Sequence, residues 1–493
     1  MLSYPCLVLC VVARLCAGLV EEKVKVVIIG GGAAGIAAAD QLHRGGEEGF
    51  VVLEAEQRVG GRVCSKKVGE GEEIVEWGAQ FIHGEEGNVA YELAEEWGLV
   101  REDDIEWGDM MVERDDNTSV DIELMGLMYT VMSGEGSIEE MMWHLSPEEA
   151  AKYGSEGEYF TASLDTVLEE KELLEYRQEA AQYLAWHGRS RGLGNGAPSW
   201  WDMPVQYPWE ECPGNQMVVL KKETNYQAFL ERLGEKVMDQ VRLGEKVVRV
   251  SREEDKVEVE TETTRYLADY VIITVSLGVL KHGAIEFMPV LPQEKLEVID
   301  DIPFGVVDKV FLEYDTEIAT LVPNLGFMGI GFLRHSEGSD TDPWKNTPSD
   351  PWEENVMGIF PDIANPRLLL MWLSGPAALH AEQLSASSLL SEVKTLLARF
   401  LPVSHPLLSP TSAYITKWGT GVHTKGSYSY TSTTMHPDSR DMLAQPVGRL
   451  LFAGEATHSS HYSTVHGAME TGRREANRVL SLENISRRTV TEL

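Results

Sequence analysis

Residues 24–62 read VKVVIIGGGAAGIAAADQLHRGGEEGFVVLEAEQRVGGR and decide the fold. The stretch begins at 24–29 with a nearly continuous run of β-branched residues, which predicts a strand buried on both faces. A glycine-rich turn follows, and small residues over 33–42 then predict a helix. Residues 50–53 are again apolar and predict a second strand. This order of strand, turn, helix and strand indicates a β-α-β unit.

The glycines of the turn follow the spacing G-x-G-x-x-G. Gly30 permits the tight turn, Gly32 lets the backbone approach a pyrophosphate, and Gly35 lets the helix pack closely on the strand. The amino end of that helix would face the phosphates with unpaired N–H groups. Glu54 lies nineteen residues beyond Gly35, where a carboxylate accepts hydrogen bonds from ribose hydroxyls. The sequence therefore predicts a dinucleotide-binding domain.

The residues that follow narrow the dinucleotide to FAD. Residues 54–62, EAEQRVGGR, match E-x-x-x-R-x-G-G-R, a signature that resembles the flavin amine oxidase superfamily. Arg58 and Arg62 can meet phosphate or flavin oxygens, and a surface loop held by an arginine pair is the alternative. Further blocks resemble the superfamily in the expected order along the chain. These are EWGAQFIHG at 76–84, ADYVIITVSLGVL at 268–280, Lys309, GSYS at 426–429, FAGEAT at 452–457 and YSTVHGA at 462–468.

Within the superfamily, the FIHG, GSYS and YSTVHGA blocks most resemble animal spermine oxidases and acetylpolyamine oxidases. Monoamine oxidases are less similar, because they tether flavin through a late cysteine and end in a membrane helix. Here no cysteine follows Cys212, and the chain after Leu480 is polar. The resemblance implies non-covalent FAD and the oxidation of polyamines such as spermine, spermidine or acetylated forms. Hydride would pass to flavin N5, the imine would hydrolyse to amine and aldehyde, and O2 would be reduced to H2O2.

Two other functions remain open from the sequence. An L-amino-acid oxidase of the same superfamily would need an arginine to hold the substrate carboxylate. A catalytically silent flavoprotein that serves as a binding module is the second alternative. Phe81, where tryptophan is usual, and residues 421–423, where D-P-Y/F is common, depart from the family and leave the preferred substrate open.

The resemblance also implies an α/β fold with two domains. A discontinuous, Rossmann-like FAD-binding domain is expected at 24–84, 213–292 and 426–482. An α+β substrate-binding domain built on a mixed six-stranded sheet is expected at 85–212 and 293–425. Apolar periodicity predicts helices over 89–97 and 164–184, and strands over 241–250, 256–261 and 268–275.

The family assigns catalytic roles to four positions of this sequence. Tyr428 should form one aromatic wall of the substrate slot, Thr464 the opposite wall, and His83 part of the tunnel near the flavin. Lys309 lies in an apolar strand, where a lysine is costly unless paired, and should hold a water near flavin N5. The alternatives are a core aromatic at Tyr428, a structural histidine at His83, and a solvent-facing edge strand at Lys309.

Further residues are expected to contact the cofactor, and no metal site is predicted. Glu54 should meet the adenosine ribose, Val247 the adenine through its backbone, and Glu455 the phosphate and ribityl region. Val465, at the start of a helix predicted over 465–479, should present its amide to flavin N1 and O2 and stabilise the reduced anion. The remaining expected contacts are Gly30, Gly32, Gly35, Arg58, Arg62, Gly78 and Ala79.

Charge and composition limit the partners. The chain has 493 residues, 43% of them apolar, and a formal net charge of −37. Such a charge makes binding to a nucleic-acid backbone improbable and would steer a small polycationic amine toward an acidic cleft. The alternative for most of these acids is a solvated surface.

The first residues of the chain indicate where the protein is directed in the cell. Residues 1–19 resemble a signal peptide, with an apolar stretch at 7–12 that is far shorter than the roughly 20 residues of a membrane anchor. A secreted chain is therefore predicted, with a cytoplasmic one as the alternative. Asn117 and Asn484 begin N-glycosylation sequons. Only Cys64 and Cys212 follow the leader, so no disulfide framework is implied, and whether these two pair is left open.

Overall fold

The computed structural model describes residues 20–69, 74–101, 110–221, 223–253, 255–334 and 349–491, with side chains up to residue 483. The predicted signal peptide at 1–19 and the side chain of Asn484 lie outside the described part. Asn117 is exposed in the turn after β6 (Met111–Arg114), with a positive φ of 63°. Among the described residues, no helix combines the length and apolar character that crossing a membrane requires.

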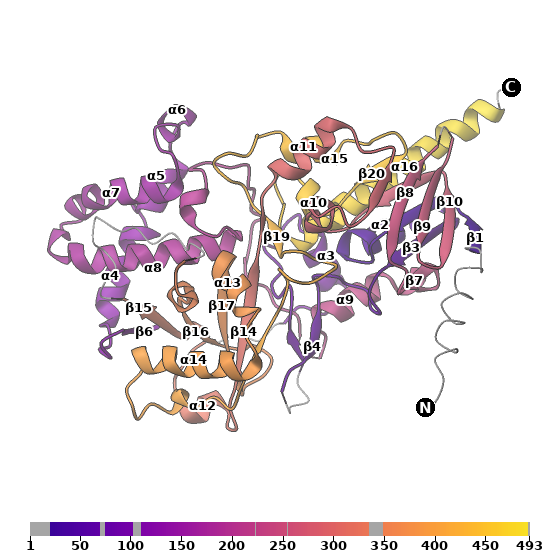
Figure 1. Ribbon diagram of the computed structural model, residues 1–493. Helices are drawn as coiled ribbons and strands as arrows, with labels where there is room; N and C mark the ends of the chain where they lie inside the picture. The colour runs from indigo at the N-terminus through magenta and orange to yellow at the C-terminus, as the bar shows by residue number, and fades with distance from the viewer. Residues whose placement is uncertain are drawn as a thin grey trace, which may run out of the picture.

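A parallel sheet of five strands forms the centre of the nucleotide-binding part (Figure 1). Every residue of β2 (Val26–Ile29) and β3 (Phe50–Glu54) is buried, as the continuous apolar run at 24–29 predicted for the first of them. Helices α2 (Ala33–Arg44) and α16 (Val465–Thr491) pack against each other beside this sheet. The strand order is β20 (Leu450–Phe452), β11 (Tyr270–Ile273), β2 (Val26–Ile29), β3 (Phe50–Glu54) and β7 (Val241–Leu243).

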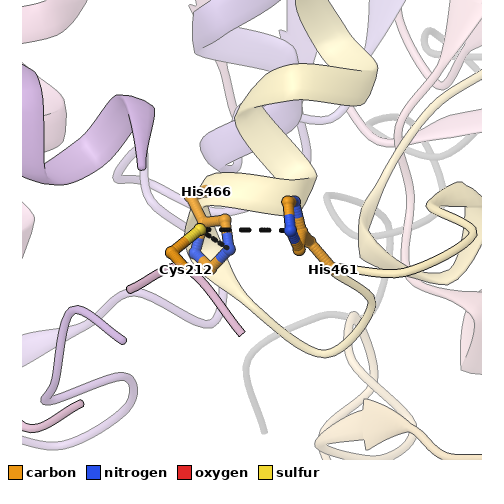
Figure 2. Close-up of side chains that lie close together, drawn as sticks. All are labelled: Cys212, His461 and His466. Atoms are coloured by element: carbon orange, nitrogen blue, oxygen red, sulfur yellow. Dashed lines mark hydrogen bonds between the residues drawn. The ribbon is translucent and has the colours of Figure 1, made fainter. Parts of the chain in front are cut away.

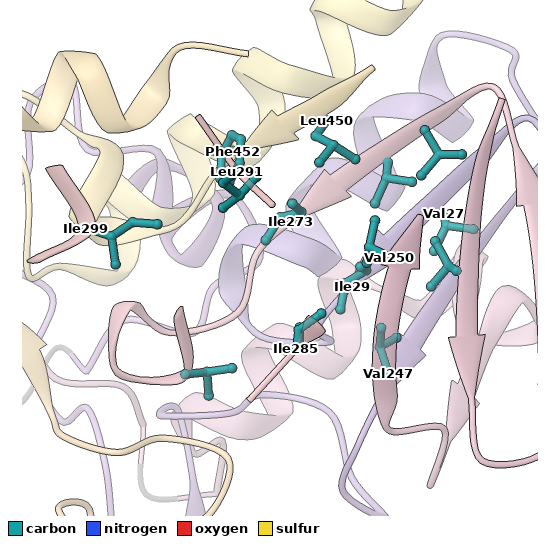
Figure 3. Packing of buried hydrophobic residues seen from close by; sticks show 14 of the residues in the cluster. Val27, Ile29, Val247, Val250, Ile273, Ile285, Leu291, Ile299, Leu450 and Phe452 are labelled. Carbon is teal, nitrogen blue, oxygen red and sulfur yellow. The ribbon is translucent and has the colours of Figure 1, made fainter. Parts of the chain in front are cut away.

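A second five-stranded sheet packs on the first through a shared apolar core. Figure 3 shows Val27 and Ile29 of the parallel sheet packed near Val250 of the second sheet. Buried and partly exposed residues alternate along β9 (Val257–Thr261) and β10 (Thr264–Ala268), because one face meets the core. The strand order is β1 (Val20–Lys23), β10 (Thr264–Ala268), β9 (Val257–Thr261), β8 (Val247–Arg252) and β12 (Glu286–Met288).

The third sheet has six strands and is mixed, as predicted. Each pair of neighbouring strands is antiparallel except β15 (Ile330–Leu333) and β6, which are parallel to each other. Helix α14 (Ala386–Phe400) supplies part of the core of this sheet. The order is β18 (Ser412–Ile415), β14 (Val307–Glu313), β17 (Leu368–Ser374), β16 (Gly358–Pro361), β15 (Ile330–Leu333) and β6.

A group of helices with its own apolar core lies beyond the six-stranded sheet, at the end of the molecule opposite the last turns of α16 (Figure 1). The group contains α4 (Ile122–Met132), α5 (Ile138–Trp143), α7 (Glu156–Glu170) and α8 (Arg177–Asn195). The α/β fold with a Rossmann-like part and a six-stranded second part is thereby confirmed. The residue bounds of the two domains remain predictions.

Several predicted elements have different bounds in the structure. The strand predicted over 241–250 is two strands, because the chain turns at Gly244, whose φ is +73°. The helix predicted over 164–184 is interrupted between α7 and α8, where Glu172 has a φ of +59°. The helix predicted over 465–479 continues to Thr491. The first two errors lie at turn residues with a positive φ, which interrupt the apolar period, whereas the third concerns only where the helix ends.

Candidate active site

The glycine-rich turn has the geometry that the spacing predicted. Gly30 has a φ of +108°, and a Cβ there would lie 2.8 Å from Thr274 Oγ1. A Cβ at Gly35 would lie 1.9 Å from the carbonyl oxygen of Gly30. At Gly32, in contrast, the nearest atom to a Cβ would be Gly60 O at 3.8 Å. Gly30 and Gly35 are therefore required for packing, whereas Gly32 faces open space on the side where a ligand would approach.

Glu54 ends β3 beside this turn. Its Oε2 accepts a hydrogen bond from the backbone N–H of Gly31 at 2.7 Å, and its Oε1 accepts one from Glu56 N at 2.7 Å. Burial raises the pKa of Glu54. Glu245 N donates to the backbone oxygen of Glu54 at 2.9 Å, so the chain that leads into β8 (Val247–Arg252) passes the end of β3.

The two arginines of the signature have different surroundings. Arg58 donates to Gly61 O at 2.7 Å and Val63 O at 3.3 Å, so its guanidinium holds the loop together. Arg62 reaches across the chain to Ser427 O at 2.6 Å and Glu455 Oε1 at 2.9 Å. The contacts of Arg58 match the structural alternative, and its role toward a cofactor remains a prediction.

Glu455 joins three of the sequence blocks. Its Oε2 accepts hydrogen bonds from Ser429 Oγ at 2.6 Å and from Ser463 N at 3.0 Å, while Oε1 is held by Arg62. Burial alone would raise the pKa of Glu455, but Arg62 and the Ser429 hydroxyl outweigh it and lower the pKa. A carboxylate that stays ionised inside the protein thus brings the GSYS, FAGEAT and YSTVHGA blocks to one place.

Lys309 is buried on β14, which has a neighbouring strand on each side, so the solvent-facing edge-strand alternative is wrong. Its Nζ donates to Glu76 O at 2.6 Å, Gly78 O at 2.9 Å and Gln80 Oε1 at 2.8 Å. Burial lowers the pKa of Lys309 to about 8. The ammonium therefore holds the segment 76–80 in place. Its predicted water contact remains a prediction.

The segment 76–80 lies directly against Arg62. A Cβ at Gly78 would lie 1.9 Å from the carbonyl oxygen of Arg62, and Ala79 N donates to that same oxygen at 3.1 Å. Gly78 is thus required by backbone packing. The segment 76–80 therefore connects Lys309 to Arg62, and Arg62 in turn contacts Glu455.

The other predicted catalytic side chains have defined contacts. The Tyr428 hydroxyl donates to Leu193 O at 3.2 Å, near the end of α8, so the ring lies between the two parts of the molecule. The Thr464 hydroxyl accepts from Gly467 N at 3.0 Å and therefore caps α16, which begins at Val465. The slot-wall role of Thr464 remains a prediction.

His83 is exposed, and its Nδ1 lies 2.8 Å from Gln216 O. Its backbone oxygen accepts from Asn88 Nδ2 at 2.8 Å. The structure does not link His83 directly to Lys309 or Tyr428 through any hydrogen bond found among the described residues.

Arg440 is a site residue that the sequence did not suggest. Its Nη1 donates to Ser429 Oγ at 2.7 Å and its Nη2 to Tyr430 O at 3.0 Å, and its guanidinium lies 3.5 Å above the ring of Tyr462. Burial lowers the pKa of Arg440 to about 10. An arginine in a short polar helix gives no sequence signal for such a role, which depends on side chains outside that helix.

The residues present fit a dinucleotide. The backbones of Gly32 and Gly61 lie close together, since a Cβ at Gly61 would lie 3.6 Å from Gly32 Cα. Because both residues are glycines, no side chain lies between these two backbone segments. Helix α2 begins next to them without a side-chain cap and without an acidic residue in its first turn. Its positive end is therefore available to phosphate oxygens. Glu54 lies beside the glycine-rich turn, and its contact with the adenosine ribose remains a prediction, as do the cofactor contacts of Arg62 and Glu455.

The chain is similar to known proteins over most of its length. Residues 33–480 match the family described as flavin containing amine oxidoreductase. The chain is 31% identical to the peroxisomal N(1)-acetyl-spermine/spermidine oxidase of Homo sapiens, over 93% of this chain and 95% of that protein. The chain belongs to the flavin amine oxidase family. It is an FAD-dependent amine oxidase, as the resemblance predicted.

A further relative and a solved structure are similar to this chain. Polyamine oxidase 1 of Oryza sativa subsp. japonica is 29% identical, over 94% of this chain and 98% of that protein. A solved structure of putrescine oxidase bound to putrescine has the same fold as this flavin amine oxidase. It gives a TM-score of 0.68 at 20% identity, over 94% of this chain and 100% of that one.

Proposed function

We propose that this flavin amine oxidase oxidises polyamines and holds FAD without a covalent bond. The observation that supports the substrate class most strongly is the 31% identity, over nearly the full length, to an N(1)-acetyl-spermine/spermidine oxidase. The net charge of −37 agrees with a cationic substrate, since it favours the approach of a small polycation.

The arginines of the site favour an amine over an amino acid as substrate. An amino-acid oxidase needs an arginine to hold the substrate carboxylate. Arg62 donates to Ser427 O and Glu455, and Arg440 donates to Ser429 and Tyr430 O. Both guanidiniums near the Glu455 cluster are thus engaged by protein oxygens, which supports the proposed preference.

Bound FAD supplies the acceptor for the hydride that leaves the carbon beside the amine nitrogen. The chain's own residues position the substrate and set its protonation. Tyr428, fixed through Leu193 O, offers an aromatic face to an alkyl amine. Burial of such a slot favours the neutral amine, which is the reactive form. Lys309 fixes the 76–80 segment beside Arg62 and, in this proposal, orients a water at the reacting face.

A peroxide assay tests the proposed function. The purified protein should be yellow and should release hydrogen peroxide when spermine or N1-acetylspermine is added. L-leucine and a simple monoamine serve as comparison substrates at the same concentration. Release of peroxide from leucine alone would overturn the polyamine proposal, while leaving the family assignment intact.

We also propose that residues 1–19 direct the chain into the secretory pathway, which the exposure of Asn117 supports. Expression in cultured animal cells, followed by amino-terminal sequencing of protein from the medium, tests this. Cleavage near residue 19 and a glycan that is lost in Asn117→Gln are expected. Protein that stays in the cytoplasm with residues 1–19 attached contradicts the proposal.

A further inference from the structure

A cluster of titratable side chains lies at the amino end of α16 and is not used in the function above. The sulfur of Cys212 lies 3.9 Å from Nε2 of His461 and 3.9 Å from Nε2 of His466 (Figure 2). Cys212 comes from the chain before α9 (Tyr226–Leu233), whereas the two histidines flank the start of α16. The positions of the protons decide what this cluster can do.

His466 directs a proton at the sulfur. Asn88 Oδ1 accepts from the backbone N–H of Ala90 at 3.0 Å and of Tyr91 at 3.2 Å, so the amino group of Asn88 is the part that faces His466. This group lies 3.3 Å from His466 Nδ1 and only donates, so Nδ1 accepts and the ring proton is on Nε2. Burial lowers the pKa of His466 to about 3 and keeps the ring neutral.

His461 presents a lone pair to the sulfur. Its Nδ1 lies 3.2 Å from Glu470 Oε2, and His458 Nε2 lies 2.8 Å from the same oxygen. Burial opposes ionisation of Glu470, but hydrogen bonds from His458 and His461 lower its pKa to about 2. The ionised carboxylate only accepts, so Nδ1 of His461 carries a proton and Nε2 is basic. The hydrogen bond to Glu470 raises the pKa of His461.

The same tautomers argue against a metal site. The donor atoms of Cys212, His461 and His466 lie within 4.8 Å of one another, which suits a metal ion in spacing. A metal ion needs a lone pair on each ligating nitrogen. Because Nε2 of His466 carries a proton, it does not bind a metal while Asn88 caps α3 (Val89–Glu96). The cluster is instead a thiol with a base on one side and a hydrogen-bond donor on the other.

We propose that Cys212 is a peroxide-reactive thiol, with His461 as its general base and His466 as a donor to the sulfur. In the reaction, Nε2 of His461 takes the thiol proton while the sulfur attacks one oxygen of hydrogen peroxide. The O–O bond breaks and an S–O bond forms, and the leaving hydroxide takes the proton from His461 to give water. Cys212 is oxidised to a sulfenic acid, and the peroxide is reduced.

Access to the thiol favours small reagents. Cys212 is 6% exposed, but its chain neighbours Glu211 and Pro213 are both exposed, so the chain runs along the surface at this position. The side chain of His461 is 17% exposed. Burial raises the pKa of the Cys212 thiol, so the resting group is the protonated thiol, which reacts once His461 accepts its proton. Hydrogen peroxide is close to water in size and polarity and fits such an approach.

Cys64 provides a matched control within the same chain. It is 7% exposed, nearly the same as Cys212, and burial raises its thiol pKa too. The charged groups that act on the Cys64 thiol are Arg58 and Lys66, which lower its pKa, and two glutamates, which raise it, so the imidazole base proposed for Cys212 is not among them. A difference in reactivity between these cysteines therefore measures the effect of the imidazoles rather than the effect of burial.

The test exposes the full-length holoprotein to added hydrogen peroxide and follows oxygen addition on each cysteine peptide by mass spectrometry. Cys212 should be oxidised at least about tenfold faster than Cys64, because general-base assistance is typically worth about 10²-fold or more. Equal rates on the two cysteines would overturn the proposal. Because the peroxide is added from outside, the result does not depend on whether the chain oxidises polyamines.

Two variants separate the base from its neighbour. His461→Gln removes the base and should slow oxidation of Cys212 at least about tenfold. His458→Gln keeps His461 and Glu470, and should leave most of the parent rate. Equal slowing by both variants would count against His461 as the base. A zinc ion bound in equimolar amount, lost in Cys212→Ser and protecting the thiol, would show a metal site and overturn the proposal.

Discussion

Replacement of Lys309 by methionine removes the ammonium while approximately keeping the length of the side chain. Three short hydrogen bonds, to Glu76 O at 2.6 Å, Gly78 O at 2.9 Å and Gln80 Oε1 at 2.8 Å, are lost. Each acceptor left without a partner costs about 1–3 kcal/mol when buried, and relief of the lysine's own desolvation offsets part of this. We expect a net loss of about 3 kcal/mol in the free energy of unfolding.

The kinetic effect should be larger than the loss of stability explains. If Lys309 orients a water at the reacting face, flavin reduction by polyamine or reoxidation by O2 should fall at least about tenfold, because such assistance is typically worth about 10²- to 10⁴-fold. Flavin content should survive. Stopped-flow absorbance separates the two half-reactions. If both rates stay within about twofold of the parent at unchanged flavin content, Lys309 has no such role and only anchors its neighbours.

Lys295 offers a matched control for this experiment. It is also buried, and burial lowers its pKa to about 8, as for Lys309. Its Nζ donates to three carbonyl oxygens near the end of α15 (Ser439–Ala444), those of Met442, Leu443 and Gln445, at 2.7, 2.8 and 2.7 Å. Lys295→Met should therefore cost a similar free energy of unfolding and leave the flavin kinetics unchanged. Equal kinetic losses in the two variants would assign the effect to stability alone.

Three further predictions follow from the same structure. Glu54→Ala should lower flavin content and activity together, measured by absorbance of protein purified without added FAD; full occupancy would contradict the ribose contact. Gly32→Ala should keep the melting temperature but lower the affinity for FAD, since the new Cβ would meet no protein atom closer than 3.8 Å. Gly35→Ala should lower the melting temperature itself, because its Cβ would lie 1.9 Å from the carbonyl oxygen of Gly30. Burial and a hydrogen bond to Glu382 raise the pKa of Asp308 from 3.8 to about 9. The folded state then favours protonated Asp308, so the contribution of this group to stability is largest below about pH 4 and is lost as the pH rises toward about 9. Asp308→Asn should flatten this decline in thermal unfolding, and parallel pH profiles would refute the assignment.

The sequence predicted those parts of the fold that depend on local patterns. The β-α-β unit could be predicted from two apolar runs and a glycine spacing. The spacing is informative because a side chain at Gly30 or Gly35 would clash with neighbouring atoms. The six-stranded sheet could be predicted only from the resemblance to a known family. Its strands come from distant parts of the chain, and β6 pairs with β15 across more than 200 residues of sequence.

The contacts that the sequence did not predict join side chains to groups outside their own helix or strand. Arg440 meets Ser429 and Tyr430 across a turn, and its helix alone looks like a solvated segment. The partners of Lys309 are carbonyl oxygens more than 200 residues earlier. No residue pattern marks a backbone carbonyl as an acceptor, so only the three-dimensional fold shows that this lysine holds a segment rather than facing solvent.

Glu455 explains why the separate blocks occur together. One carboxylate binds Arg62 from the first block, Ser429 from the GSYS block and Ser463 from the loop before α16. Each of these groups is costly to bury alone, and each is satisfied by the same pair of oxygens. Loss of the carboxylate would leave Arg62 without its ion pair and free the loop that sets the start of α16. The fold of the site and its capacity to hold a cofactor therefore depend on the same buried charge.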